Sequence, residues 1–151
     1  MCGVAGSGKS AHARELTAQG YVVLSFDALA WELGHRQHPL GDGARAEVHA
    51  ALQERLRRSV TSGENVVVDS SFWSRASRDE YRRLLERWNV VPVVHHVTAP
   101  RHVVLERLAR HRNSGPDDIA VPADLAHAYL DGFEAPRGDE GPVVQIDGSA
   151  S

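Results

Sequence analysis

Lysine and cysteine are almost absent from this chain of 151 residues: Lys9 is its only lysine, Cys2 is its only cysteine, and the other basic side chains among its 17 are arginine. A single cysteine excludes a disulfide framework and a cysteine-based metal site. No apolar run approaches the length of a membrane span, and the first residues lack the basic and apolar regions of a secretory signal. We therefore expect a soluble, cytoplasmic protein with no membrane partner.

An excess of positive charge is also lacking. The chain has 17 basic and 20 acidic residues and a net charge of −3, which excludes the broad basic surface that long nucleic acid requires. Its nine histidines show no metal-ligand spacing, because the adjacent His95 and His96 of a predicted strand point to opposite faces. The candidate functional residues must therefore be sought in local motifs.

The single lysine lies in such a motif. Residues 3–10 read Gly-Val-Ala-Gly-Ser-Gly-Lys-Ser and fit the phosphate-loop pattern G-x-x-x-x-G-K-[ST] at every fixed position. In such a loop, backbone N–H groups and the start of the following helix form an anion-binding hollow. Lys9 would neutralise charge on the transferring phosphoryl group, and Ser10 would bind Mg²⁺. The predicted nucleotide-binding residues are Gly3, Gly6, Ser7, Gly8, Lys9, Ser10 and Ala11.

Valine-rich strands alternate with helical patterns along the chain, which predicts one α/β domain over residues 1–151 with a parallel sheet covered on both faces. The expected strands are 1–4, 21–26, 66–69, 90–98 and 143–146. The expected helices are 9–19, 28–34, 43–61, 75–88, 101–112 and 122–133. Only Met1 and Cys2 precede Gly3, although a central first strand normally brings four or five apolar residues. Either this strand is stunted, or the natural chain starts further upstream.

Two carboxylates occupy predicted strand ends, where open parallel sheets place their sites. Asp69 follows three valines and resembles a Walker B carboxylate, suited to hold Mg²⁺. Asp27 could accept the proton of an acceptor hydroxyl as a general base. The alternative for each is a helix N-cap, which Asp also favours.

Side chains near these carboxylates could line a pocket for the acceptor. Ser71, Phe72 and Trp73 follow Asp69, and Trp31 comes one helical turn after Asp27. The alternative is that the aromatic residues only pack helices on the sheet. Arg75 and Arg78 could reach an anionic acceptor, although their helix face also suits surface ion pairs.

Three arginines at a helix end lead into a loop that contains Gly115 and Pro116. Arg107, Arg110 and Arg112 could form a lid that excludes water and stabilises transition-state charge. Arg107 and Arg110 are the catalytic candidates, and Arg107 and Arg112 are candidates for nucleotide contacts. The alternative is a solvated helix end, where cations are also favoured.

The phosphate loop, the strand ends at Asp27 and Asp69, and the Arg107-x-x-Arg110 segment together resemble small P-loop kinases. The group is the AAA-type ATP-binding proteins that include chloramphenicol phosphotransferase, zeta-toxin-like kinases and polynucleotide 5′-kinase domains. The resemblance covers nearly the whole chain. It implies a P-loop NTPase three-layer sandwich with a five-stranded parallel sheet in the order 2-3-1-4-5 and helices on both faces.

The same resemblance implies the roles of individual residues. Asp27 matches the general base of the family, and Lys9 and Ser10 match its phosphate and Mg²⁺ ligands. Phe26 departs from the polar or basic residue that polynucleotide kinases carry before the aspartate, which disfavours a nucleic-acid acceptor.

These observations predict a kinase that uses Mg²⁺ and either ATP or GTP to phosphorylate a hydroxyl of a small molecule such as an antibiotic, a nucleoside or a sugar-like metabolite. One alternative is a polynucleotide 5′-hydroxyl kinase. Another is a regulatory module that binds nucleotide without transferring phosphate, although such a module needs no base at Asp27.

Overall fold

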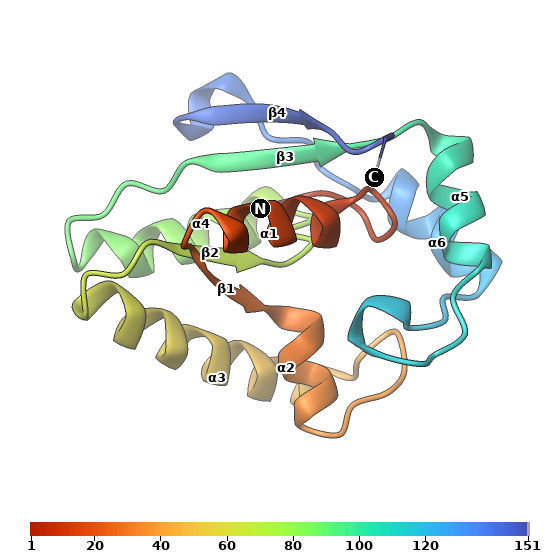
Figure 1. Cartoon of the computed structure of the whole chain (residues 1–151), viewed down its shortest axis with the longest axis horizontal. Helices are drawn as coiled ribbons and strands as arrows, with labels where there is room; N and C mark the ends of the chain where they lie inside the picture. Colours follow the sequence, from red (N-terminus) through yellow and green to blue (C-terminus); the bar gives the residue numbers. More distant parts are fainter. Residues whose placement is uncertain (151) are drawn as a thin grey trace.

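A computed structural model describes residues 1–150 and shows an α/β fold with parallel strands (Figure 1). The strands are β1 (Val22–Ser25), β2 (Val66–Asp69), β3 (Val94–Thr98) and β4 (Val143–Asp147). The helices are α1 (Lys9–Ala18), α2 (Phe26–Glu32), α3 (Asp42–Thr61), α4 (Arg75–Glu86), α5 (Arg101–Ala109) and α6 (Ala123–Asp131), with 3-10 turns η1 (Pro116–Asp118) and η2 (Gly138–Glu140). Alternation of strand and helix is therefore confirmed.

The strands form two parallel pairs, β1 with β2 and β3 with β4. Residues 1–3 lie between the pairs and contribute one isolated bridge, Cys2 with His96. The Met1 amine donates to the Val68 carbonyl at 2.6 Å, and the Cys2 amide donates to the His95 carbonyl at 2.8 Å. The expected first strand is thus reduced to a single bridged residue, and the order 2-3-1-4-5 of one continuous sheet stays a prediction.

Local capping explains where two helices begin. The Ser74 hydroxyl accepts a hydrogen bond from the Ser77 amide at 3.2 Å, which confirms the predicted N-cap of α4. The Ser25 hydroxyl accepts a hydrogen bond from the Ala28 amide at 3.1 Å. Helix α2 therefore starts at Phe26, two residues before the predicted start. Asp27 consequently lies in the first turn of α2 and not at the end of a strand.

Two other predicted elements are shorter than expected. The strand predicted over 90–98 begins only at Val94, after Asn89 in the left-handed region (φ +55°) and Pro92. The helix predicted over 101–112 ends at Ala109, with Arg110 as its C-cap.

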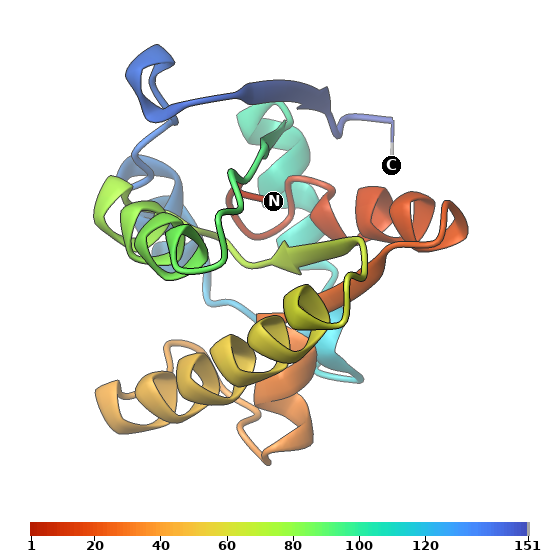
Figure 2. The same cartoon turned by 90° about the vertical axis from the view of Figure 1, so that its left-hand side faces the viewer.

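The hydrophobic core lies between the strands and the helices on either side of them. Along α3, Val48, Leu52 and Leu56 recur at four-residue spacing and are almost fully buried. They pack in one cluster with Tyr81 and Leu85 of α4. Figure 2 shows α1 and α4 on opposite sides of β2. Within residues 1–150, no helix has the length and apolar content needed to cross a membrane.

Candidate active site

The glycines of the phosphate loop hold a backbone that other residues would not adopt. Gly6 and Gly8 have φ of +80° and +104°, values that side chains with a Cβ rarely take. A Cβ on Gly3 would lie 2.3 Å from the Val97 carbonyl oxygen. Gly8 also precedes α1 as its N-cap residue. The loop therefore leads directly into the N-terminus of α1, where free backbone N–H groups can bind an anion.

Lys9 and Ser10 are the first two residues of α1. The Lys9 Nζ donates to the Val4 carbonyl at 3.0 Å, so the ammonium curls back over the loop. The Ser10 hydroxyl donates to Asp117 Oδ1 of η1 at 2.9 Å. Asp117 was missed by sequence reasoning, because an acidic residue in a loop that contains glycine and proline gives no signal beyond a turn.

Asp69 ends β2 beneath this loop and is 7% exposed. Burial raises the pKa of its carboxyl above the usual range, and the positive charge of Lys9 lowers it again in part. Among the described residues, its Oδ1 atom has no hydrogen-bond partner. A buried carboxylate oxygen without a partner, on the wall of a cavity that Ser10 also lines, fits Mg²⁺, which takes one or two protein oxygens together with phosphate and water. The described residues contain no group of three or more His, Cys, Asp or Glu side chains that could hold a metal without a nucleotide.

A cavity of about 340 Å³ lies between the phosphate loop and the segment from the end of α5 to η1. Its lining includes the side chains or backbone of Gly6, Gly8, Lys9, Ser10, Ala11, Asp27, Asp69, Arg107 and Arg110. The structure thus brings together most of the residues predicted for nucleotide, metal and catalysis. Ser7 lies within the loop, fully buried, with its hydroxyl unpartnered among the described residues.

The three predicted lid arginines have different surroundings. Arg107 Nη1 donates to the carbonyls of Gly6 (3.2 Å) and Gly148 (2.8 Å), so it ties α5 to the phosphate loop. Arg110 lines the cavity. Arg112 turns away from the cavity and donates to the Ala109 and His111 carbonyls.

A second cavity, of about 330 Å³, adjoins the first. The two share Ala5, Lys9, Asp27, His38 and Val121, so a group bound in either would meet the same ammonium and carboxylate. His38 Nε2 lies 3.9 Å from Asp27 Oδ1. His38 was missed because a lone histidine before a proline carries no motif.

The walls of the second cavity combine aromatic and aliphatic side chains with several polar and charged groups. The predicted residues Ser71, Phe72 and Trp73 line it, and they are joined by Phe26, Arg45, His49, Ser70, Tyr129 and Phe133. Phe72 has φ +43°, an unusual conformation for a bulky residue and one that is often found at binding sites. Burial raises the pKa of Tyr129, and the charge of Asp27 raises it further. No pattern in the sequence linked Tyr129 or Phe133, from the end of the chain, to Asp27.

Three residues predicted for the acceptor pocket, Trp31, Arg75 and Arg78, do not line the second cavity. Trp31 carries Arg36 over its ring, 3.9 Å from the ring centre. Arg75 pairs with Asp139 at 2.8 Å. These contacts keep both side chains out of either cavity.

Arg78 does not line the second cavity, although it contacts the backbone of Phe72, which does. Its guanidinium makes two bonds to the Glu140 carboxylate (2.7 and 2.9 Å) and one to the Phe72 carbonyl (2.8 Å), and it is 4% exposed. The Glu140 carboxylate neutralises the charge of Arg78, and the bond to the Phe72 carbonyl holds the turn at Phe72 in place. Arg78 is therefore not available to a ligand in the second cavity.

Comparisons with solved structures agree with this geometry. A gluconokinase from Sinorhizobium meliloti 1021 is 28% identical, with a TM-score of 0.65 over 96% of this chain and 79% of that one. A sugar kinase from Janibacter sp. HTCC2649 is 25% identical, with a TM-score of 0.69 over 97% and 82%. Kti12 from Chaetomium thermophilum, solved with ADP-AlF3, is 19% identical and shows the same fold, with a TM-score of 0.73 over 96% and 86%.

No curated protein sequence is significantly similar to the chain. A family model, in contrast, matches most of it: the model described as an AAA domain (AAA_33) covers residues 1–136. The P-loop NTPase-like fold and the resemblance to small AAA-type P-loop kinases are thereby confirmed. The chain belongs to this AAA domain family.

Proposed function

We propose that the chain is a single-domain kinase that transfers the γ-phosphate of ATP or GTP to a hydroxyl of a small molecule. One observation carries this proposal: the phosphate-loop cavity and the second cavity share Lys9 and Asp27. A nucleotide in the first cavity and an acceptor in the second would place their reacting groups at this junction. A module that only binds nucleotide has no need of the second cavity.

The residues of the first cavity divide the work of binding. The loop amides and Lys9 would hold the β- and γ-phosphates, and Arg107 of α5 and its C-cap residue Arg110 line the same cavity. Ser10 and Asp69 would hold Mg²⁺, which when bound neutralises charge on the phosphates. The Ser10 hydroxyl donates its hydrogen to Asp117 at 2.9 Å in this structure, so a lone pair of the same oxygen would stay available to Mg²⁺.

Asp27 would act on the acceptor. Its carboxylate takes the proton of the acceptor hydroxyl as that oxygen bonds to the γ-phosphorus, and the nucleoside diphosphate leaves on the opposite side. With its side chain 46% exposed, Asp27 can reach a bound hydroxyl. His38 at 3.9 Å is suited to orient the carboxylate.

Among the three acceptor classes expected from the sequence, a sugar-like metabolite has the most support. Two of the similar structures, at 28% and 25% identity, are a gluconokinase and a sugar kinase. Aromatic faces such as Trp73 and Phe133 suit the apolar face of a sugar, and Arg45 adds a cation for an acidic group. An antibiotic or a nucleoside also fits aromatic walls, and both belong in the test.

The test is a transfer assay with γ-labelled ATP and, in parallel, γ-labelled GTP. Sugars, sugar acids, nucleosides, antibiotics and an oligonucleotide with a free 5′-hydroxyl are offered as acceptors. We expect labelled product with one class of small molecule and none with the oligonucleotide. Labelling of the oligonucleotide would favour a polynucleotide kinase, and nucleotide binding without transfer to any acceptor would favour a regulatory module.

A further inference from the structure

His49 of α3 lines the second cavity and is held there by one of its two ring nitrogens. Its Nδ1 atom lies 2.9 Å from the hydroxyl oxygen of Tyr81 in α4. Among residues 1–150, its Nε2 atom has no hydrogen-bond partner. The ring packs against Phe26, with the ring centres 4.8 Å apart, and Phe26 directly precedes the proposed base Asp27. The nitrogen without a partner therefore belongs to a ring next to the site of the proposed transfer.

The hydroxyl of Tyr81 is held in turn by Gln53, which lies one helical turn after His49 on the same side of α3. Burial raises the pKa of Tyr81, the charge of Glu80 raises this pKa further, and a hydrogen bond from the Gln53 side chain opposes both. The Gln53 amide also donates to Glu80 at 2.9 Å, which fixes the orientation of the amide. Tyr81 therefore keeps its proton, while its oxygen already receives a hydrogen bond from Gln53.

These contacts decide which ring nitrogen of His49 carries the proton. In a neutral imidazole one nitrogen donates a hydrogen bond and the other receives one. If Nδ1 carried the proton, the Tyr81 oxygen would receive two hydrogen bonds, and among the described residues its own hydrogen would have no partner. A buried hydroxyl that is left in this state destabilises the fold. Tyr81 therefore donates to Nδ1, and the proton of His49 lies on Nε2.

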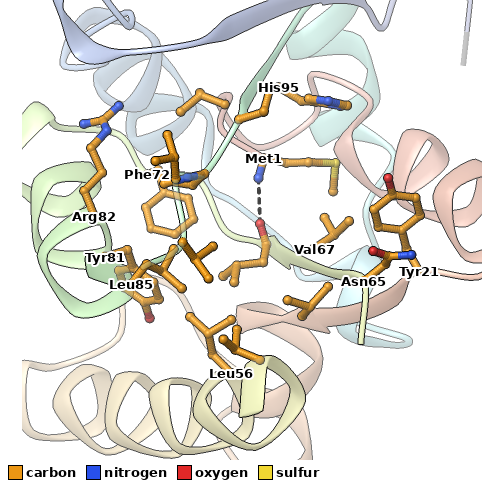
Figure 3. Close-up of a pocket in the computed structure, with 18 of the residues that line it drawn as sticks. Met1, Tyr21, Leu56, Asn65, Val67, Phe72, Tyr81, Arg82, Leu85 and His95 are labelled. Carbon is orange, nitrogen blue, oxygen red and sulfur yellow. Dashed lines mark hydrogen bonds between the residues drawn. The ribbon is translucent and has the colours of Figure 1, made fainter. Parts of the chain in front are cut away.

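Packing around Tyr81 keeps these hydrogen bonds in one geometry. The Tyr81 side chain is 5% exposed and meets the ring of Phe72 edge-on, with the ring centres 4.9 Å apart. Figure 3 shows the two rings together, with Leu85 beside them, on the wall of a third cavity of about 580 Å³. A phenol that is packed in this way fixes the direction in which the Nε2–H bond of His49 points.

The charge state of His49 is also set by its surroundings. Burial lowers the pKa of His49; the charge of Glu80 opposes this shift, and the charge of Arg45 adds to it. The ring is therefore neutral at pH 7 and above, and it offers one N–H donor. His49, Tyr81 and Gln53 do not line the phosphate-loop cavity, so nucleotide binding does not account for this arrangement.

We propose that His49 is a specificity-determining residue of the acceptor site: its Nε2–H group donates a hydrogen bond to an oxygen of the bound acceptor other than the hydroxyl that is phosphorylated. Tyr81 and Gln53 are positioning residues that act through His49. The inference rests on the proposed function, because it takes the second cavity to be the acceptor site. A compound with a carbon atom in place of that oxygen would leave the Nε2 proton unpaired and would bind more weakly.

The first measurement needs no ligand. Two-bond proton–nitrogen correlation spectra at about pH 8, above the ordinary pKa of histidine, report which nitrogen of each ring is protonated. The spectrum of His49→Gln, which lacks one of the nine histidine rings, identifies the signals of His49. We expect the proton on Nε2 in the wild type and a mixture of both tautomers in Tyr81→Phe. A proton on Nδ1 in the wild type, or the same spectrum in Tyr81→Phe, would overturn the proposal.

The second measurement is binding of the compounds from the transfer screen, in the presence of Mg²⁺ and a non-hydrolysable ATP analogue. We expect one class of compound to shift the Nε2 signal of His49. Its Kd should rise about ten- to a hundredfold in His49→Phe, and less than about threefold in His49→Gln, whose amide keeps a donor. Nucleotide affinity should be unchanged in both variants.

A double variant separates positioning from packing. Tyr81→Phe should raise the Kd of that compound about three- to tenfold in the wild-type background, and less than about twofold in His49→Phe, because Tyr81 acts through His49. Independent losses in the two backgrounds would overturn the proposal, as would equal losses in His49→Phe and His49→Gln. A screen in which no compound shifts the Nε2 signal would also overturn it. A compound that shifts this signal but receives no phosphate would refute the proposed function and leave the role of His49 in binding intact.

Discussion

At the scale of single residues, Asp69 carries a charge that its surroundings disfavour. Burial raises the pKa of its carboxyl, so the folded state binds this proton more tightly than the unfolded state does. The charged form consequently lowers the free energy of unfolding at pH values above the raised pKa, and Mg²⁺ binding, which needs that charged form, weakens as the pH falls through it.

Replacement of Asp69 by asparagine separates these two effects. We expect Asp69→Asn to raise the melting temperature of the nucleotide-free protein by about 2–4 °C, since the buried charge is gone. We also expect it to abolish the effect of Mg²⁺ on nucleotide affinity. Calorimetry with and without Mg²⁺ measures both, and the exposed Asp139→Asn serves as the matched control. A lower melting temperature together with unchanged Mg²⁺ dependence would rule out the metal site.

Asp27 is the residue on which transfer depends most. We expect Asp27→Asn to lower kcat about 10²–10⁴-fold and to leave nucleotide affinity unchanged, because the amide cannot take a proton. Steady-state kinetics with the acceptor found by the screen, together with nucleotide titration, measure the two quantities. A native kcat in the variant would show that Asp27 is not the general base and serves only in the first turn of α2.

At the scale of elements, Arg78 and Glu140 fix η2 and the Phe72 turn to α4. The Arg78 guanidinium lowers the pKa of Glu140 to about 2, from the usual 4.5. A depressed carboxyl pKa stabilises the fold above the unfolded value, and this stabilisation is lost as the pH falls from about 4.5 toward 2. We expect Glu140→Gln to flatten the loss of stability in this pH range, as followed by urea unfolding at several pH values.

Removal of one partner of this pair leaves the other buried and charged. We expect Arg78→Ala to lower the free energy of unfolding by about 3–5 kcal/mol, and to raise KM for the acceptor more than KM for the nucleotide through the Phe72 turn. Arg75→Ala, which breaks the exposed pair with Asp139, should cost less than about 1 kcal/mol. An equal loss in the free energy of unfolding for the two variants would contradict the burial of the Arg78 ion pair.

The loop at η1 holds Asp117 against the phosphate loop. Its carboxylate accepts the Ser10 hydroxyl at 2.9 Å and adds negative charge where phosphates would bind. We expect Asp117→Asn to tighten nucleotide binding about two- to fivefold at low salt, and less at high salt, because the repulsion is screened. Fluorescence titration at two ionic strengths measures this, and weaker binding would mean that Asp117 helps to hold the metal.

At the scale of the whole molecule, local patterns predicted more than long-range placement. The phosphate-loop motif, the buried face of α3 and the Ser74 cap could be predicted because each depends on neighbours within a few residues. The side chains that complete the acceptor cavity, Tyr129 and Phe133, could not be, because only the tertiary fold brings them near Asp27. Arg78 was wrongly assigned to the pocket, because its ion-pair partner Glu140 lies 62 residues away along the chain and no local pattern links the two.

The central claim is phosphoryl transfer that depends on Lys9, and one measurement tests it most directly. Wild type and Lys9→Ala are compared for transfer of labelled γ-phosphate to the acceptor, at matched circular dichroism and melting cooperativity. We predict that turnover falls by at least about 10³-fold in the variant, because the ammonium stabilises charge in the transition state. Native turnover in folded Lys9→Ala would contradict the account.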